Sequence, residues 1–356
     1  MAANNIAYGF VSLENVFAER VTTIGVQTIW DAINESAAEY NRQITALMST
    51  MVARTTAWQE RYKLPGTGTL QPLDQYGNPV PVREGGFYDI AYPIQGAGTA
   101  WGTDRVSRQL MTVQEANRQT IEALKRDTDW MRRHILAALF DNVEWTFADP
   151  EHGNLVIKPL ANNDAVKYVM QGGVAEADNH YLAQASAIAD ASNPFPTIYD
   201  ELTEHPANIG ADIVCYIPSN LRASIEGLTA FHPTNDPNLV YADNVTTLRT
   251  QIDPGFGDIV RGYVDKVWIV EWKALPDNYM VAHARGAEPV VMQREYEAPQ
   301  LQGLITENFS PDGALNETRL IRYCGFGVRN RVGALVMQIG NASYAIPTGY
   351  DAPLAV

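Results

Sequence analysis

The sequence predicts an α+β fold, and three observations lead to that prediction. Residues 26–64 and 113–141 carry apolar side chains at helical spacing, which indicates two long helices. Residues 62–102 are rich in glycine and proline, which is typical of turns and irregular structure. From residue 150 onward, short apolar segments between turn signals indicate mainly strands. Long helices therefore characterise the first part of the chain and extended segments the second.

The first helix is predicted from an interval without helix breakers. Residues 26–64 contain no glycine or proline, so nothing in the sequence interrupts a helix there. Thr28 is the expected N-cap, because its hydroxyl can accept a hydrogen bond from a free backbone N–H group. The apolar positions recur every three, four or seven residues: Ile29, Ile33, Ala37, Tyr40, Ile44, Leu47, Met51 and Trp58.

The glycine- and proline-rich segment 62–102 is too long to be an ordinary connection. It holds eight glycines and five prolines, and Tyr76-Gly77-Asn78-Pro79 is a turn signal near its middle. A structureless loop of this length is unusual inside a compact domain, so we expect it to be functional or partnered. Residues 87–94 can return as a strand. We therefore predict a long projecting loop of two strands, which should rest on another subunit because isolated hairpins are marginally stable.

The second helix has the strongest local signal in the chain. Thr112-Val-Gln-Glu115 matches a capping box, in which the two polar side chains satisfy backbone donors at a helix start. The apolar periodicity that follows predicts a helix to about Asp141, roughly 40 Å long at 1.5 Å per residue. Helices in globular proteins usually have three or four turns, so this one is long. It is the expected rigid strut of the molecule.

The second half of the chain indicates a compact α/β unit followed by closing strands. We predict helices at 198–204 and 221–228, a strand at 213–217 and a hydrophobic hairpin at 263–286. Extended segments at 289–297, 298–308 and 319–339 close the fold. A shorter helix is expected at 178–191, with Asp178 as its cap.

Motifs that carry chemistry are not evident in the sequence. Six histidines are scattered without the spacing of a metal-ligand pair, and the aspartate cap is a simpler account of Asp178 beside His180. Gly255-Phe-Gly257 and Gly325-Phe-Gly327 lack the remaining residues of a phosphate loop, so tight turns explain them better. No G-x-S-x-G motif is present. We therefore expect no enzyme activity, no cofactor and no metal.

Composition and charge restrict the classes of partner that we expect for this protein. The formal net charge is −15, from 26 basic and 41 acidic residues, and such a surface repels phosphate backbones, which argues against sequence-specific nucleic-acid binding. Cys215 and Cys324 lie far apart and are expected to be buried small hydrophobic residues in a reducing compartment. The longest apolar runs are too short to span a bilayer, so no membrane partner is expected.

The order of these elements resembles that of the major capsid proteins of tailed bacteriophages, whose fold is shared with the herpesvirus capsid floor and with encapsulins. The segments "DIVCYIPSNLRASIEGL", "GDIVRGYVDKVWIVEWKALPDNYMVAHARGAEPVVM" and "RLIRYCGFGVRNRVGALVMQIG" are similar in type and order to segments of that family. The resemblance implies six parts: a largely helical N-terminal arm (1–61), an extended loop (62–102), a peripheral domain (103–192) with a spine helix (112–141), an axial domain (193–289), a return to the peripheral domain (290–345) and a C-terminal tail (346–356).

The resemblance implies a structural subunit of an icosahedral phage head. Copies of the chain would form pentamers and hexamers that enclose double-stranded DNA, in a virion assembled in the cytoplasm of a host bacterium. The chain begins at a methionine without room for a cleaved scaffolding segment, so a separate scaffolding protein is expected, beside a portal and, as a further candidate, a decoration protein. The loop residues expected to contact a neighbouring subunit are Leu64, Leu70, Tyr76, Phe87, Tyr88 and Tyr92.

Two alternatives stay open from the sequence. The first is an encapsulin-like protein compartment, which would hold cargo enzymes in place of DNA. The second is an acidic cytosolic α/β hydrolase or binding protein, with a site near Asp178, His180, His232 and Asp236 and with residues 62–102 as its lid.

Overall fold

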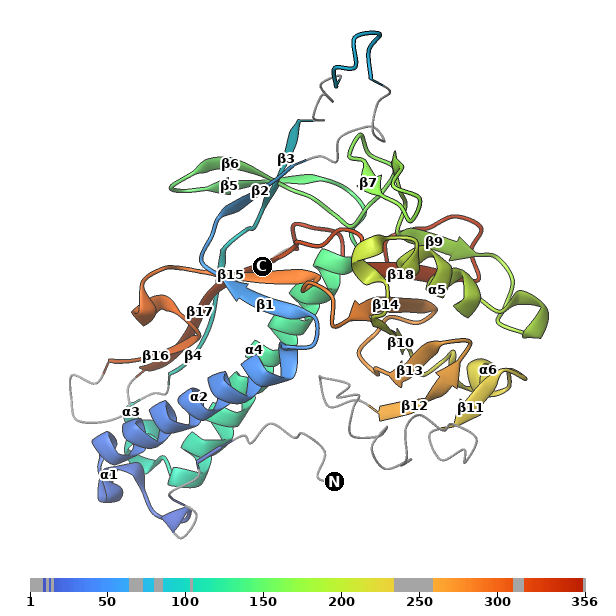
Figure 1. The fold of residues 1–356 in the computed structure, drawn as a ribbon. Helices are drawn as coiled ribbons and strands as arrows, with labels where there is room; N and C mark the ends of the chain where they lie inside the picture. The colour runs from blue at the N-terminus through green and yellow to red at the C-terminus, as the bar shows by residue number, and fades with distance from the viewer. Residues whose placement is uncertain are drawn as a thin grey trace, which may run out of the picture.

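Two β-sheets and two long helices organise the chain (Figure 1). The computed structural model describes residues 9–10, 13, 16–63, 73–79, 86–102, 105–233, 259–309 and 317–354. A five-stranded sheet packs with helices α2 and α4, whereas a seven-stranded sheet is accompanied by helices α5 and α6 (Figure 1). Within these residues, no helix combines the length and the apolar composition needed to cross a bilayer.

The first predicted helix is shorter than its sequence pattern suggested. Helix α1 (Val21–Ile24) is followed by α2 (Val26–Met48), whose cap is Gly25 with a φ of 101° and not Thr28. The predicted positions from Ile29 to Ile44 form its buried face. The prediction of a helix to residue 64 is wrong, because strands β1 (Val52–Thr55) and β2 (Gln59–Lys63) follow. The β-branched residues there favour extended structure, and β1 pairs in parallel with β15.

The second predicted helix is confirmed as α4 (Val113–Phe140). It follows the short helix α3 (Arg105–Leu110), and the Thr112 hydroxyl accepts a hydrogen bond from the backbone N–H of Glu115 at 3.2 Å. The backbone N–H groups of Val113 and Gln114, which have no partner within the helix, donate to the main-chain carbonyls of residues 19 and 17. The Glu115 carboxylate binds Arg118 instead of the cap, so half of the predicted capping box forms.

Strand β17 (Glu317–Val328) is the centre of the five-stranded sheet. Strand β4 (Gln95–Gly102) pairs along one side of it, and β16 (Leu304–Phe309) and β15 (Val291–Glu295) pair in turn along the other. Strand β1 completes the sheet beside β15. Helix α4 contacts β17 and β4, and α2 contacts β16, which buries the apolar faces of both helices.

The two glycines of Gly325-Phe-Gly327 lie inside strand β17, so the prediction of a tight turn is wrong at this position. A Cβ atom at Gly325 would lie 2.3 Å from the carbonyl oxygen of Pro93, and one at Gly327 would lie 3.0 Å from the Tyr92 ring. Glycine is therefore required where residues 91–94 cross the strand. The motif Gly255-Phe-Gly257 lies outside the described residues.

The seven-stranded sheet has the order β11-β12-β13-β10-β14-β18-β9. The strands are β9 (Tyr181–Gln184), β10 (Asp212–Ile217), β11 (Phe231–Pro233), β12 (Ile259–Val264), β13 (Val267–Glu271), β14 (Tyr279–Arg285) and β18 (Ala334–Ile339). Helices α5 (Phe195–Thr203) and α6 (Arg222–Glu226) contribute Ile198, Leu202 and Ile225 to the core beside this sheet.

Two expectations for this part of the chain are wrong. The predicted hairpin 263–286 does not form, because β10 lies between β13 and β14 and pairs with both, in parallel with β13 and antiparallel with β14. Strand β10 is apolar along most of its length, which suits a central position buried on both faces. The predicted helix 178–191 is replaced by β9 and a 3₁₀ turn, Asp190–Ser192.

The seven-stranded sheet also draws on more of the chain than the predicted axial domain. Strands β9 and β18 fall within the ranges 103–192 and 290–345, which the resemblance gives to the peripheral domain. They join the sheet because β18 pairs with β14 on one side and β9 on the other. The division into arm, loop, peripheral and axial domains remains a prediction. The other elements are β3 (Phe87–Ala91), β5 (Trp145–Asp149), β6 (Gly153–Ile157), β7 (Tyr168–Val169), β8 (Ala175–Glu176) and the 3₁₀ turns Pro206–Asn208 and Pro299–Leu301.

Candidate functional sites: the projecting loop and a buried histidine–aspartate cluster

The segment 62–102 begins as a hairpin that projects from the body of the molecule (Figure 1). Strands β2 and β3 pair antiparallel, with Arg61 opposite Asp89 and Tyr62 opposite Tyr88. The Arg61 guanidinium donates two hydrogen bonds to the Asp89 carboxylate, at 2.6 and 2.9 Å, and the two tyrosine rings stack with centroids 5.6 Å apart. The prediction of a two-stranded loop is confirmed for these residues.

The base of the loop is fixed to its own chain. Tyr92 is fully buried in a cluster with Ile90 and Met292, and the neighbouring Pro93 crosses strand β17. A side chain with no exposed surface cannot contact a neighbouring subunit. The prediction that Tyr92 contacts another subunit is therefore wrong, and its ring anchors the loop instead. Tyr88 is half-buried against the same cluster.

The tip of the loop has the opposite character. Asp74 accepts hydrogen bonds from the backbone N–H groups of Tyr76 and Asn78, both at 2.8 Å, which closes a tight turn. The Tyr76 side chain is 79% exposed, and Phe87 at the outer end of β3 is 64% exposed. Leu73, which the sequence analysis missed, lies three residues before Tyr76 and is 61% exposed. Leu64 and Leu70 lie outside the described residues.

Three large apolar side chains of this loop are exposed to solvent in the single chain. Leu73, Tyr76 and Phe87 contact water in the single chain, although burial of each would be favourable by about 1.5–3 kcal/mol. Exposed apolar surface that forms a contiguous patch often marks a site of interaction with another protein. The geometry therefore suits docking of the tip onto another protein surface.

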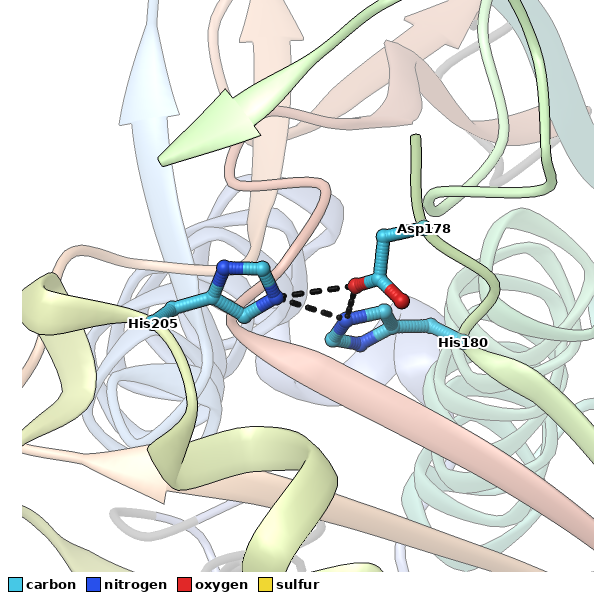
Figure 2. A group of neighbouring side chains, drawn as sticks. All are labelled: Asp178, His180 and His205. Carbon is cyan, nitrogen blue, oxygen red and sulfur yellow. Dashed lines mark hydrogen bonds and ion pairs between the residues drawn. The ribbon is translucent and has the colours of Figure 1, made fainter. Parts of the chain in front are cut away.

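A second site lies in the interior, where Asp178, His180 and His205 meet (Figure 2). Asp178 Oδ2 lies 2.5 Å from His180 Nε2 and 2.9 Å from His205 Nε2, and the two Nε2 atoms are 3.2 Å apart. All three residues are buried. Asp178 and His180 lie in the extended segment before β9, whereas His205 follows helix α5.

Backbone contacts hold these side chains in place. His180 Nδ1 lies 2.6 Å from the carbonyl oxygen of Ala334, and His205 Nδ1 lies 3.2 Å from that of Val169. The other Asp178 oxygen accepts a hydrogen bond from the backbone N–H of Asn179 at 2.6 Å. The predicted helix cap at Asp178 is wrong, since no helix begins there.

The electrostatic environment of the cluster favours a negative charge on Asp178 and a positive charge on His205. Burial opposes ionisation of Asp178, but the two imidazoles within hydrogen-bond distance outweigh it and hold the pKa of Asp178 below its usual range. Burial also opposes a charge on His205, yet the hydrogen bond to Asp178 raises the pKa of His205 above its usual value. Glu201 and Glu204 lie beside the cluster, and burial together with the nearby carboxylates raises the pKa of both.

The site considered for a hydrolase or binding protein does not come together. Asp178 and His180 lie next to β9, at one edge of the seven-stranded sheet, whereas His232 lies in β11 at the opposite edge. Asp236 falls outside the described residues. The cluster that the structure shows is completed by His205. A motif search could not have found this residue, because it lies 25 residues from His180 in the sequence.

The comparisons with known proteins concern the fold. No protein-family model matches the chain, and no curated protein matches it in sequence. Among solved structures, a protein of Mycobacterium phage Patience is 21% identical, with a TM-score of 0.64 over 93% of this chain and 92% of its own. A chain of the bacteriophage PhiM1 mature capsid is 11% identical, with a TM-score of 0.47 over 82% and 84% of the two chains. The SrpI encapsulin of Synechococcus elongatus PCC 7942 is 12% identical, with a TM-score of 0.42 over 83% and 88%.

The likeness to the Patience protein spans nearly the whole of both chains, so it concerns the arrangement of all the main elements and not one shared motif. The chain therefore has the α+β fold of the tailed-phage major capsid proteins, as the sequence analysis predicted.

Proposed function

We propose that this chain is the major capsid subunit of a tailed bacteriophage, a structural and non-enzymatic protein that assembles into the icosahedral shell of the head. The observation that supports this most strongly is the fold, which it shares with a phage protein along nearly its full length. The loop supports it independently, because its apolar tip is exposed while its base is anchored in the chain. Pentamers and hexamers would arise from repeated contacts between unlike surfaces, which close into rings.

The charge of the chain fits a container for DNA. A formal net charge of −15 gives a surface that repels phosphate, so a packaged genome would be enclosed without sequence-specific binding. The wider set of partners in this proposal is a separate scaffolding protein, a portal and a decoration protein. The place of the protein is the virion capsid, after assembly in the cytoplasm of the host bacterium.

Two tyrosines of the same loop test the proposal. Tyr76→Ala removes an exposed ring from the tip, so assembly should fall by at least about tenfold while the urea unfolding midpoint of the unassembled chain stays unchanged. Tyr92→Ala leaves a cavity at the base and should lower the free energy of unfolding by about 3–5 kcal/mol. Sedimentation velocity and electron microscopy measure assembly of the full chain over a range of concentrations.

Large closed particles from the unaltered chain, with loss of those particles in Tyr76→Ala, would support the proposal. A chain that stays monomeric at every concentration, with Tyr76→Ala behaving identically, would contradict it. Nucleic acid inside particles recovered from infected cells indicates a phage head, whereas packaged enzymes would indicate an encapsulin-like compartment.

A further inference from the structure

When both imidazoles are neutral, the histidine–aspartate cluster contains three lone pairs that face one another. A carbonyl oxygen only accepts hydrogen bonds, so Nδ1 of His180 and Nδ1 of His205 each carry the ring proton, which they donate to Ala334 and Val169. In neutral imidazoles this leaves both Nε2 atoms as acceptors. Asp178 Oδ2 is also an acceptor when ionised, and all three atoms lie within 3.2 Å of one another. Such a group is stable only with a positive charge among the three atoms.

We propose that Asp178, His180 and His205 form a binding site for one divalent transition-metal ion, with Zn²⁺ as the ion that fits best. Two imidazole nitrogens and a carboxylate oxygen are ligands that zinc prefers, at about 2.0–2.2 Å. Tetrahedral ligands of one ion at those distances lie about 3.3–3.6 Å from each other. The three atoms here lie 2.5 to 3.2 Å apart, so each pair would need to separate by about 1 Å or less to hold the ion. Calcium and magnesium prefer oxygen ligands, so imidazole nitrogens disfavour them.

The surroundings of the three ligands match a metal site in a second respect. A histidine that binds a metal usually donates its other ring N–H to a carbonyl or carboxylate, which fixes the ring and its tautomer. Both histidines here have that contact with a main-chain carbonyl. The two contacts come from separate parts of the chain, β18 and β7, so the fold itself orients both rings toward Asp178 (Figure 2).

A fourth ligand is available from the acidic side of the cluster. Glu204 Oε1 lies 3.8 Å from His205 Nε2, and Asp178, Glu201 and Glu204 form a second set of ligand atoms within 4.8 Å of one another. The Glu204 side chain is 37% exposed, so the acidic side of the cluster reaches the protein surface. Concentrated negative charge beside the two imidazoles attracts a cation and not an anion.

The ion would have a structural role. It would join the segment before β9, at the edge of the seven-stranded sheet, to the segment after α5. Through the Val169 carbonyl it would also fix the small hairpin of β7 and β8. Binding to the folded chain alone raises its unfolding temperature in proportion to the logarithm of ion concentration. This role does not depend on shell assembly and can be measured on the unassembled chain.

The test uses the full chain after removal of metals with EDTA and dialysis. Titration with Zn²⁺ and with Co²⁺, followed by calorimetry and by visible absorption of bound Co²⁺, should show one ion per chain and a rise in the unfolding temperature. Absence of both signals in the unaltered chain would overturn the proposal and leave a proton as the charge in the cluster. Because this measurement needs no variant, it remains valid if the variants below fail to fold.

His205→Gln should weaken Zn²⁺ binding by more than about a hundredfold, since even changes around a ligand cost ten- to a hundredfold. His152→Gln is the matched control, because His152 is exposed and stacks on Trp58 outside the cluster. Equal affinity in both variants would show that the ion binds elsewhere and would also overturn the proposal.

Discussion

The two large sheets of the molecule are stabilised by different kinds of interaction. In the five-stranded sheet, buried ion pairs connect the strands to other elements: Arg322 of β17 binds Asp127 of α4 at 2.7 Å, and Arg294 of β15 binds Asp149 of β5 at 2.7 Å. In the seven-stranded sheet, the residues of β10, β13, β14 and β18 are buried and mostly apolar, and the buried charge of Glu271 lies at the end of β13.

This difference follows from where the elements come from in the sequence. Asp127 and Arg322 are 195 residues apart, and Arg294 and Asp149 are 145 apart, so the five-stranded sheet joins distant parts of the chain. Most of the seven-stranded sheet comes from one region between residues 181 and 285. We infer that the ion pairs specify which distant elements meet, because a misplaced buried charge without its partner is costly. The seven-stranded sheet relies on hydrophobic burial.

The largest effect should come from breaking an ion pair of the five-stranded sheet. Asp127→Asn keeps the shape of the side chain but leaves the buried Arg322 guanidinium without its counter-charge, and it weakens the hydrogen bond from the Tyr40 hydroxyl. The free energy of unfolding should fall by about 3–5 kcal/mol, measured by urea denaturation.

Asp129→Asn is the matched control for that variant, two residues along the same helix. The Asp129 side chain is 65% exposed and pairs with Arg132 at the surface, so its loss should change the free energy of unfolding by about 1 kcal/mol or less. Similar losses in the two variants would show that the buried pair does not stabilise this sheet more than a surface pair does.

In the seven-stranded sheet, we expect a loss of stability at acidic pH. His283 lies in β14 with its ring stacked on Tyr216, and burial lowers its pKa to about 4. The unfolded chain takes up a proton near pH 6.5, whereas the folded chain resists it until about pH 4. The free energy of unfolding therefore falls as the pH drops through this interval, by about 2 kcal/mol from this residue between pH 7 and pH 5.

His283→Leu should remove that contribution. Its Nε2 atom has no hydrogen-bond partner among the described residues, so an apolar side chain leaves no new group unsatisfied. The quantity to measure is the difference in unfolding free energy between pH 7 and pH 5, in which any constant effect of the substitution cancels. His152→Leu, at an exposed position, should keep the full difference. An unchanged difference in His283→Leu would mean that other groups cause the acid sensitivity.

The same contrast explains what the sequence could and could not predict. Helix α4 was predictable because its cap and its apolar spacing are local properties of residues 112–140. The end of α2 was not, because β1 is a strand only through its pairing with Val291, some 239 residues later. The position of β10 between β13 and β14 was not predictable either, because tertiary packing decides which of several similar apolar strands become neighbours.

The candidate sites follow this rule as well. The exposed tip of the loop was predictable at Tyr76 and Phe87 from composition and turn signals. Tyr92 was misjudged, because only the crossing of residues 91–94 over β17 shows that its ring is buried. The cluster around Asp178 could not be predicted, because it includes His205, which follows the C-terminal end of α5 and reaches Asp178 only in the folded chain.

The smallest effect concerns the start of α4, which supports the five-stranded sheet. Thr112→Ala removes the hydroxyl that accepts the Glu115 N–H, so the free energy of unfolding should fall by about 1 kcal/mol, as is usual for a lost N-cap. Thr112→Ser keeps the acceptor and should restore most of that loss. Both are measured by urea denaturation beside Asp127→Asn. Because the N–H groups of Val113 and Gln114 already donate to main-chain carbonyls, one missing hydroxyl leaves a single donor to solvent, whereas a broken ion pair leaves a buried charge. A loss in Thr112→Ala as large as that in Asp127→Asn would mean that the helix start, and not the ion pair, holds α4 against the sheet.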